Sequence, residues 1–149
     1  MGKRIFILLC FLVLLSMGFT TGGWYGTEAS RKAQIQFVLD GGGSPITTGA
    51  KVWTRIPFDM TIQGWDITAD QSGSIVIDVW KDTYANFPPT DADSIAGTEL
   101  PTLSSAQKNQ DTNLTSWTTT VNEGDYIRIN VDSASTVTFV TLDIYGVKQ

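Results

Sequence analysis

The sequence predicts an all-β protein, most simply a jelly-roll-like β-sandwich preceded by an N-terminal hydrophobic signal or anchor helix. Apolar side chains alternate with polar ones through most of the chain after residue 29, which is the pattern of half-buried strands. Turn-forming residues separate these runs at short intervals, as in folds built from two antiparallel sheets. No segment after the leader has the periodicity of a helix.

Residues 1–29 are the predicted signal peptide or membrane anchor, and residues 30–149 are the predicted β-sandwich domain. Lys3 and Arg4 precede an apolar run from Ile5 to Phe19, and a basic start before an apolar run of this length is typical of a secretory signal. The run is shorter than the ~20 apolar residues of a usual transmembrane helix. We therefore expect export, with membrane contact only through this segment if it stays uncleaved.

The composition excludes several classes of function. The chain has no histidine, and its single cysteine, Cys10, lies inside the apolar run. The usual Ser–His–Asp triad and the usual zinc ligands are therefore missing from the predicted domain. The formal net charge is −5 and no basic cluster follows the leader, which argues against nucleic-acid binding because phosphate neutralisation needs grouped lysine and arginine.

Six alternating runs are the predicted strands: residues 34–40, 51–58, 62–67, 74–80, 125–132 and 136–145. In the strongest run, Ser74 to Trp80, the isoleucines occupy one face, and Asp78 and Trp80 lie on the other. Gly64 interrupts the third run, and we expect a β-bulge there. The predicted turns are residues 40–45, 71–73, 122–125 and 132–135.

One long segment, Lys81 to Lys108, has a different composition. It contains Pro88, Pro89 and Pro101, and proline at these places excludes a central strand. We predict a long ordered excursion here, followed by a strand near residues 113–121. Two interpretations are open: a functional loop, or a structured crossover between two sheets.

Four aromatic side chains are candidate ligand-binding residues. Trp53 and Trp80 fall on the strand faces opposite the aliphatic residues, and Tyr84 and Phe87 belong to the excursion. If those faces are exposed, the rings are available to stack on sugars or to anchor a protein partner. If the faces are covered, the same rings are core.

Acidic side chains provide the remaining candidates. Asp91 and Asp93 in the excursion are candidate ligand-binding residues, because hard oxygen atoms suit calcium. The segment lacks the ordered ligand series of a calcium loop, so the sequence assigns neither a metal nor a cofactor. Asp66 and Asp70 belong to a wider set of aspartates that raises the alternative of glycoside hydrolysis, which needs two carboxyl groups ~5 to 9.5 Å apart. No spacing selects such a pair.

Several stretches carry a wider resemblance: residues 38–44, 46–49, 69–81, 101–106 and 130–138. Together they resemble a β-sandwich module of phage tail-fibre-like and other virion-associated proteins. The resemblance covers roughly residues 36–147 and implies a setting on a virion, where such modules form trimers. The leader also allows a bacterial surface or secreted protein built from the same module.

These observations predict a non-enzymatic extracellular or virion-associated module that binds a surface glycan or a protein receptor through the excursion and exposed tryptophans. The first alternative is a self-assembling structural subunit of a surface filament or virion, with a trimer or filament as the homo-oligomer and residues 22–35 available for strand donation. The second alternative is a carboxylate-based glycoside hydrolase. The predicted location is secreted, on the cell surface or on a virion.

Overall fold

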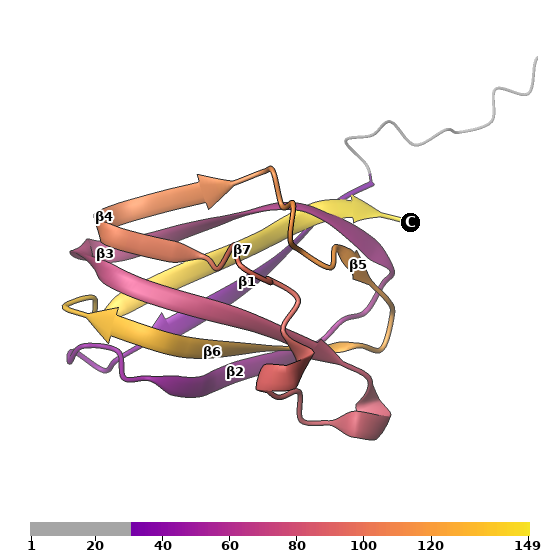
Figure 1. The fold of residues 1–149 in the computed structure, drawn as a ribbon, viewed down its shortest axis with the longest axis horizontal. Coiled ribbons are helices and arrows are strands. Elements are labelled where there is room, and N and C mark those ends of the chain that lie inside the picture. Colours follow the sequence, from indigo (N-terminus) through magenta and orange to yellow (C-terminus); the bar gives the residue numbers. More distant parts are fainter. Residues whose placement is uncertain (1–30) are drawn as a thin grey trace, which may run out of the picture.

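The structure, a computed structural model, is all-β and describes residues 31–149; the predicted leader lies outside these residues. Seven antiparallel strands form one curled sheet (Figure 1). The strands are β1 (Lys32–Asp40), β2 (Gly49–Arg55), β3 (Met60–Asp82), β4 (Thr102–Asp111), β5 (Thr120–Val121), β6 (Tyr126–Ser135) and β7 (Phe139–Lys148), with the short 3-10 helices η1 (Tyr84–Asn86) and η2 (Asp91–Asp93). Within the described part of the chain, no helix is long and apolar enough to cross a membrane.

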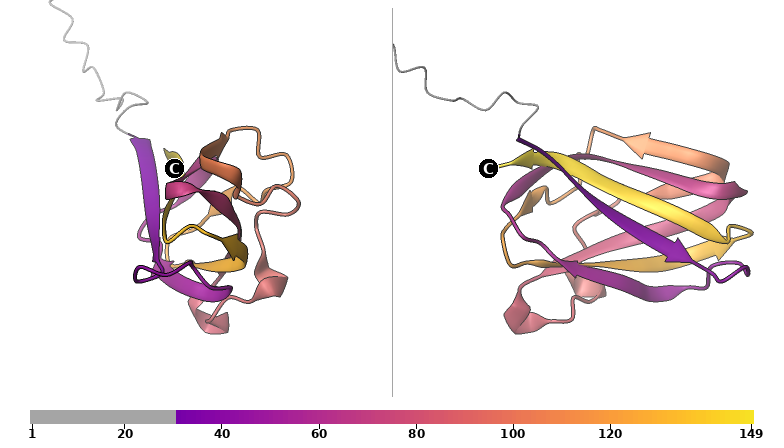
Figure 2. Two further views of the ribbon diagram at one scale, coloured as in Figure 1. Left: turned by 90° about the vertical axis from the view of Figure 1, so that its left-hand side faces the viewer. Right: turned by 180° about the vertical axis from the view of Figure 1, so that it is seen from behind.

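The long strand β3 joins the two halves of the sheet. Its residues up to Ala69 pair with β7, and its residues from Ser74 onward pair with β6. On its other side, β3 pairs with β4 along both stretches. The strand order is β1-β7-β3-β6-β2, and the bend of β3 brings the sheet back over itself, so that its halves face each other across the core (Figure 2).

The core is built from alternate residues of both halves. In β6, Ile127, Ile129 and Val131 are at most 1% exposed, whereas Tyr126 and Arg128, which alternate with them, lie on the outer face and are half-buried. Each fully buried isoleucine contributes about 1.5–3 kcal/mol relative to an exposed one. The predicted alternation is confirmed in this strand.

Two local predictions based on glycine are also confirmed. The register of β3 against β7 shifts between Ile62 and Gly64, which is the expected bulge. A Cβ atom at Gly64 would lie 2.8 Å from the backbone carbonyl oxygen of Asp111 in the neighbouring strand, so the position requires glycine. In the turn after β1, Gly42 and Gly43 have φ values of 64° and 83°, which favour glycine.

The strand predicted near residues 113–121 is misplaced. The structure has β4 within the predicted excursion, at Thr102–Asp111, and only the two-residue β5 at Thr120–Val121. β4 lies at an edge of the sheet, and Leu103 is its one fully buried side chain. Both of its faces are therefore largely polar, which removes the alternation that marks the other strands.

Two predicted turns are instead parts of strands. Residues 71–73 lie within β3, where the chain bends without leaving the sheet, and residues 132–135 are the end of β6. Gly73 sits at the bend with no room for a Cβ atom against Thr136 and Ser135. The close approach of the neighbouring strand, which depends on tertiary structure, explains why this glycine marks a bend and not a turn.

Candidate functional site

A row of three side chains crosses the outer face of the half formed by β2, β6 and β3. Trp53 of β2 is the cross-strand neighbour of Arg128, and Arg128 is the neighbour of Trp80 in β3. The guanidinium carbon of Arg128 lies 5.9 Å from the ring centroid of Trp53 and 5.8 Å from that of Trp80. Both distances are within the range of a cation–π contact.

The excursion folds over this row. The backbone N–H of Ile95 donates to the carbonyl oxygen of Val79 at 2.8 Å, and Ser94 forms an isolated β-bridge with Trp80. The segment leaves β3 and returns to β4, which pairs with β3, so it is a loop between neighbouring strands and not a crossover. It covers Trp80, whose side chain is 8% exposed.

The excursion also completes a cluster of aromatic rings. The Phe87 ring centroid lies 5.8 Å from that of Trp53 and 4.9 Å from that of Tyr126, and the Tyr84 centroid lies 6.2 Å from that of Tyr126. Ring pairs at such distances are worth about 0.5–1.5 kcal/mol each beyond their burial. We call these four residues, Trp53, Tyr84, Phe87 and Tyr126, the aromatic platform.

The platform is open to solvent although its rings touch. Trp53 is 52% exposed, Tyr84 is 76% exposed and Phe87 is 39% exposed. These three were candidates from the sequence, and the structure brings them together. Tyr126 was missed, because its place beside Phe87 depends on how the excursion folds onto β6.

Arg128 was also missed, and it ties the excursion to the sheet. Its Nη1 donates to the carbonyl oxygen of Pro89 at 3.0 Å, while its Nε is buried and has no hydrogen-bond partner among the residues that the structure describes. The only signal in the sequence is its position between the buried Ile127 and Ile129, which directs it outward. The strand register that sets it between two tryptophans is not a local property.

Trp80 lies beneath this surface and is fixed by a buried carboxylate. Asp78 accepts hydrogen bonds from Trp80 Nε1 at 2.7 Å, from Ser94 Oγ at 2.6 Å and from the Val79 N–H at 2.7 Å. The bond from Ser94 holds the excursion against β3, and the bond from Trp80 fixes the indole. Trp80 therefore lies beside Arg128 under the excursion and does not share the exposure of the platform.

The two acidic candidates of the excursion belong to η2. Asp93 Oδ2 accepts hydrogen bonds from the N–H of Thr90 at 2.7 Å and from its hydroxyl at 2.8 Å. The first of these bonds is the carboxylate half of a capping box, in which the Thr90 side chain faces the N–H of Asp93. Asp91 begins the same 3-10 helix and is exposed. Across residues 31–149, no group of three or more acidic, histidine or cysteine side chains is arranged to hold a metal ion.

An ionised carboxylate lies beside the platform. Asp82 is the cross-strand neighbour of Tyr126. Hydrogen bonds from the Thr83 N–H at 2.6 Å and from Asn86 Nδ2 at 3.1 Å lower the pKa of the Asp82 carboxyl. The Asp82 carboxylate therefore places hydrogen-bond acceptors at the edge of the platform, next to the ring of Tyr126.

A second carboxylate arrangement lies on the outer face of the other half. Asp66 of β3 and Asp143 of β7 are direct cross-strand neighbours, a position that holds Cβ atoms about 4.5–5.5 Å apart. Burial, and then the charge of Asp143, raises the pKa of Asp66. Asp143 Oδ1 accepts hydrogen bonds from Gln34 at 2.7 Å and Gln36 at 2.9 Å. The sequence pointed to Asp66 but not to its neighbour.

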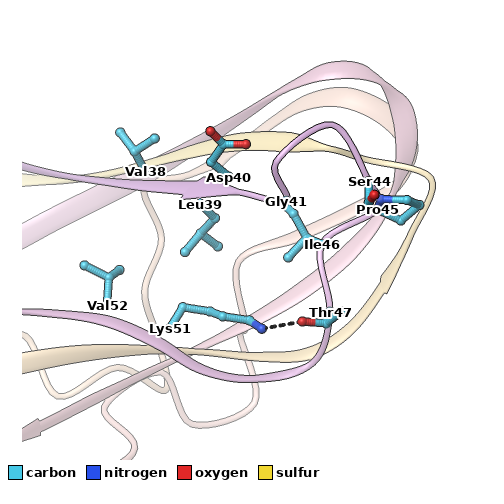
Figure 3. A pocket seen from close by; sticks show the side chains of 10 residues that line it. All are labelled: Val38, Leu39, Asp40, Gly41, Ser44, Pro45, Ile46, Thr47, Lys51 and Val52. Atoms are coloured by element: carbon cyan, nitrogen blue, oxygen red, sulfur yellow. Dashed lines mark hydrogen bonds between the residues drawn. The ribbon is translucent and has the colours of Figure 1, made fainter.

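A separate cavity of about 390 Å³ lies between the end of β1 and the start of β2 (Figure 3). Val38 and Leu39 line one side and Val52 the other, and Lys51 Nζ donates to Thr47 Oγ1 at 2.7 Å. No platform residue lines this cavity. It marks the seam where the two ends of the curled sheet approach each other.

No protein-family model, no curated protein and no solved structure matches the chain.

Proposed function

We propose that this protein is a non-enzymatic binding module that recognises a surface glycan or a protein receptor through the aromatic platform. The observation that carries the proposal is the exposure of Trp53, Tyr84 and Phe87, which are 52%, 76% and 39% exposed although they come from two different segments and pack together. Aromatic rings gathered on a surface retain a large apolar area that a ligand can cover.

The chemistry of the platform favours a glycan. The apolar faces of sugar rings stack on exposed aromatic rings, and their hydroxyl groups need hydrogen-bond acceptors at the edge. Asp82, ionised and next to Tyr126, supplies such an acceptor. The Arg128–Pro89 hydrogen bond and the η2 capping box each restrain part of the excursion, which lowers the entropy cost of binding.

We also infer that the curled sheet is a jelly-roll-like β-sandwich. With β3 and β4 each divided at their bends, the pairing gives one layer β1-β7-β3-β4 and a second layer β2-β6-β3-β4. Eight strand segments in two layers are the arrangement of a jelly roll. An experimental structure in which β3 runs straight past Asp70 contradicts this inference.

The setting that we propose is a secreted protein, a cell surface or a virion. The basic and apolar residues of the leader and the resemblance to virion-associated modules support it. The structural-subunit alternative is supported by the edge strands of the sheet, and the hydrolase alternative by the Asp66–Asp143 pair.

The first test is a glycan array probed with the full chain and with Trp53→Ala and Tyr84→Ala. We expect each variant to weaken binding roughly 30-fold, the effect of removing an anchoring ring worth about 2 kcal/mol. Phe139→Ala is the matched control, because Phe139 is 41% exposed but lies on β7, outside the platform.

The same experiment separates the alternatives. If Trp53→Ala and Phe139→Ala weaken glycan binding equally, the result contradicts a role for the platform. Asp66→Asn leaves binding unchanged if the platform is the site. If the wild-type chain releases sugar from bound glycans and Asp66→Asn abolishes that release, the result favours the hydrolase, with Asp66 as general acid.

A further inference from the structure

The curled sheet leaves edge strands whose outer sides pair with nothing in the described part of the chain. Among residues 31–149, β1 pairs only with β7, and β2 pairs only with β6. An edge strand presents free N–H and C=O groups to a second chain, and proteins usually protect such edges with bulges, charges or proline. An edge strand without a register shift or a proline is therefore better suited to pair with a second chain than one that contains them.

β1 is the regular edge. Its nine residues pair with β7 without a register shift. The register of β2 shifts between Ala50 and Val52, and that of β4 shifts around Gly73 of its neighbour β3. β1 also contains no proline. It has neither a bulge nor a proline, and its protection against pairing consists of a charged residue at each end and the approach of β2 at the seam beside Leu39.

Those two charges are complementary. β1 begins with Lys32 and ends with Asp40, and both side chains are exposed. If two β1 strands pair antiparallel about a two-fold axis at Gln36, Lys32 of each copy lies opposite Asp40 of the other. The symmetry produces two such ion pairs, one at each end of the contact.

The apolar residues fit the same register. Ile35 is half-buried in one copy, and the pairing sets it opposite Phe37 of the second copy on the inner face. Val38, which is 46% exposed, lies opposite Gln34 of the second copy. Cross-strand neighbours of this kind are the unit of sheet stabilisation.

We propose that two copies of this chain associate through antiparallel pairing of their β1 edges, centred on Gln36, to form one sheet across the dimer. The contact is isologous and closes at two copies, so it does not by itself extend into a filament. No platform residue lies on β1, so both platforms stay free. The pairing goes beyond the proposed function and does not depend on it, although two platforms in one dimer raise the avidity for a multivalent glycan.

Position-specific crosslinking tests the register. In the full chain with Cys10→Ser, Gln36→Cys is expected to convert most of the protein into a disulfide-linked dimer on oxidation. Cross-strand neighbours have Cα atoms about 4.5–5.5 Å apart, within the range of a disulfide. Gln34→Cys and Val38→Cys are each expected to stay monomeric on their own, since identical positions would be about 14 Å apart along the strand. A mixture of these two variants is expected to crosslink.

A charge exchange tests the ends of the contact. Lys32→Asp sets like charges opposite each other and is expected to weaken dimerisation about tenfold or more in analytical ultracentrifugation. The double variant Lys32→Asp with Asp40→Lys restores the opposite charges and is expected to recover it. Lys108→Asp, the same charge change on the irregular edge β4, is the matched control.

Three results overturn the proposal. The first is a wild-type chain that sediments as a monomer at millimolar concentration. The second is equal crosslinking of folded Gln34→Cys, Gln36→Cys and Val38→Cys on their own, which indicates random collision. The third is association that depends only on the leader, so that none of the charge variants changes the dimerisation constant. Glycan binding is measured separately, so failure of the dimer does not affect the proposed function.

Discussion

Arg128 is a cation fixed between two indole rings by contacts that no other cationic side chain could reproduce in full. A guanidinium is planar and stacks on aromatic faces, whereas the ammonium of lysine is a compact, strongly hydrated charge. In this protein the planar group bridges Trp53 and Trp80 while donating to the carbonyl oxygen of Pro89. The residue therefore joins the sheet to the excursion that carries half of the platform.

We expect Arg128→Lys to destabilise the protein by about 2 kcal/mol, from the loss of stacking and of a hydrogen bond to a charged donor. Thermal unfolding measures the effect, and hydrogen exchange is expected to rise in residues 83–100. Arg55→Lys is the control, because Arg55 is an exposed residue of the same outer face. Equal effects of the two substitutions contradict the special role of Arg128.

Among the elements of the fold, β3 connects the two halves of the sheet, because it pairs with β7 before its bend and with β6 after it. Asp70 lies at that bend and holds the turn between β6 and β7. Its carboxylate accepts hydrogen bonds from Thr138 Oγ1 at 2.6 Å and from the N–H groups of Thr138 and Phe139 at 3.1 Å each. These bonds lower the pKa of the Asp70 carboxyl.

A lowered pKa gives the stability of the fold a defined pH dependence. The contribution of Asp70 is present above its ordinary pKa, about 3.9, and is lost as the pH falls through the lower folded value. We expect Asp70→Asn to lower the melting temperature at neutral pH, and the difference from wild type to shrink as the solution is acidified below that range. Thermal melts across pH measure this. Asp91→Asn, at the exposed start of η2, is the control, and a difference that persists in acid contradicts the assignment.

The whole molecule is organised around one core that both halves of the sheet share. The buried cluster includes Phe37 from β1, Ile67 from β3, Ile129 from β6 and Leu142 from β7. Neither half can keep these side chains away from water without the other. The platform is therefore presented by a fold that forms as a unit, and its geometry depends on residues far from it.

We expect Ile129→Ala to destabilise the protein by about 2–5 kcal/mol, since Ile129 is 0% exposed and its truncation leaves a cavity in the shared core. Chemical denaturation followed by tryptophan fluorescence and by circular dichroism measures it. Both signals are expected to change in a single transition, because one core supports both halves. Separate transitions contradict this view. Val38→Ala, at a 46% exposed position, is expected to change stability by no more than about 0.5 kcal/mol.

The local pattern of the sequence was sufficient for the all-β class and for most strands, but it left open whether the faces that carry Trp53 and Trp80 are covered or exposed. Side-chain direction along a strand alternates with a period of two, and this property needs no knowledge of distant segments. The bulge at Gly64 and the turn at Gly42 and Gly43 were also readable, because each depends on the backbone freedom of glycine. Trp53 was recognised as a candidate from the alternation of its strand, and Tyr84 and Phe87 from the composition of the excursion.

Only the tertiary structure decided what depends on pairing between distant residues. Strand register set Arg128 between two tryptophans, and the fold of the excursion set Phe87 against Tyr126 and covered Trp80. β4 escaped prediction because an edge strand with two polar faces has no alternation. These features are long-range contacts, and a sequence read residue by residue contains the alternation of each strand but not the identity of its neighbour.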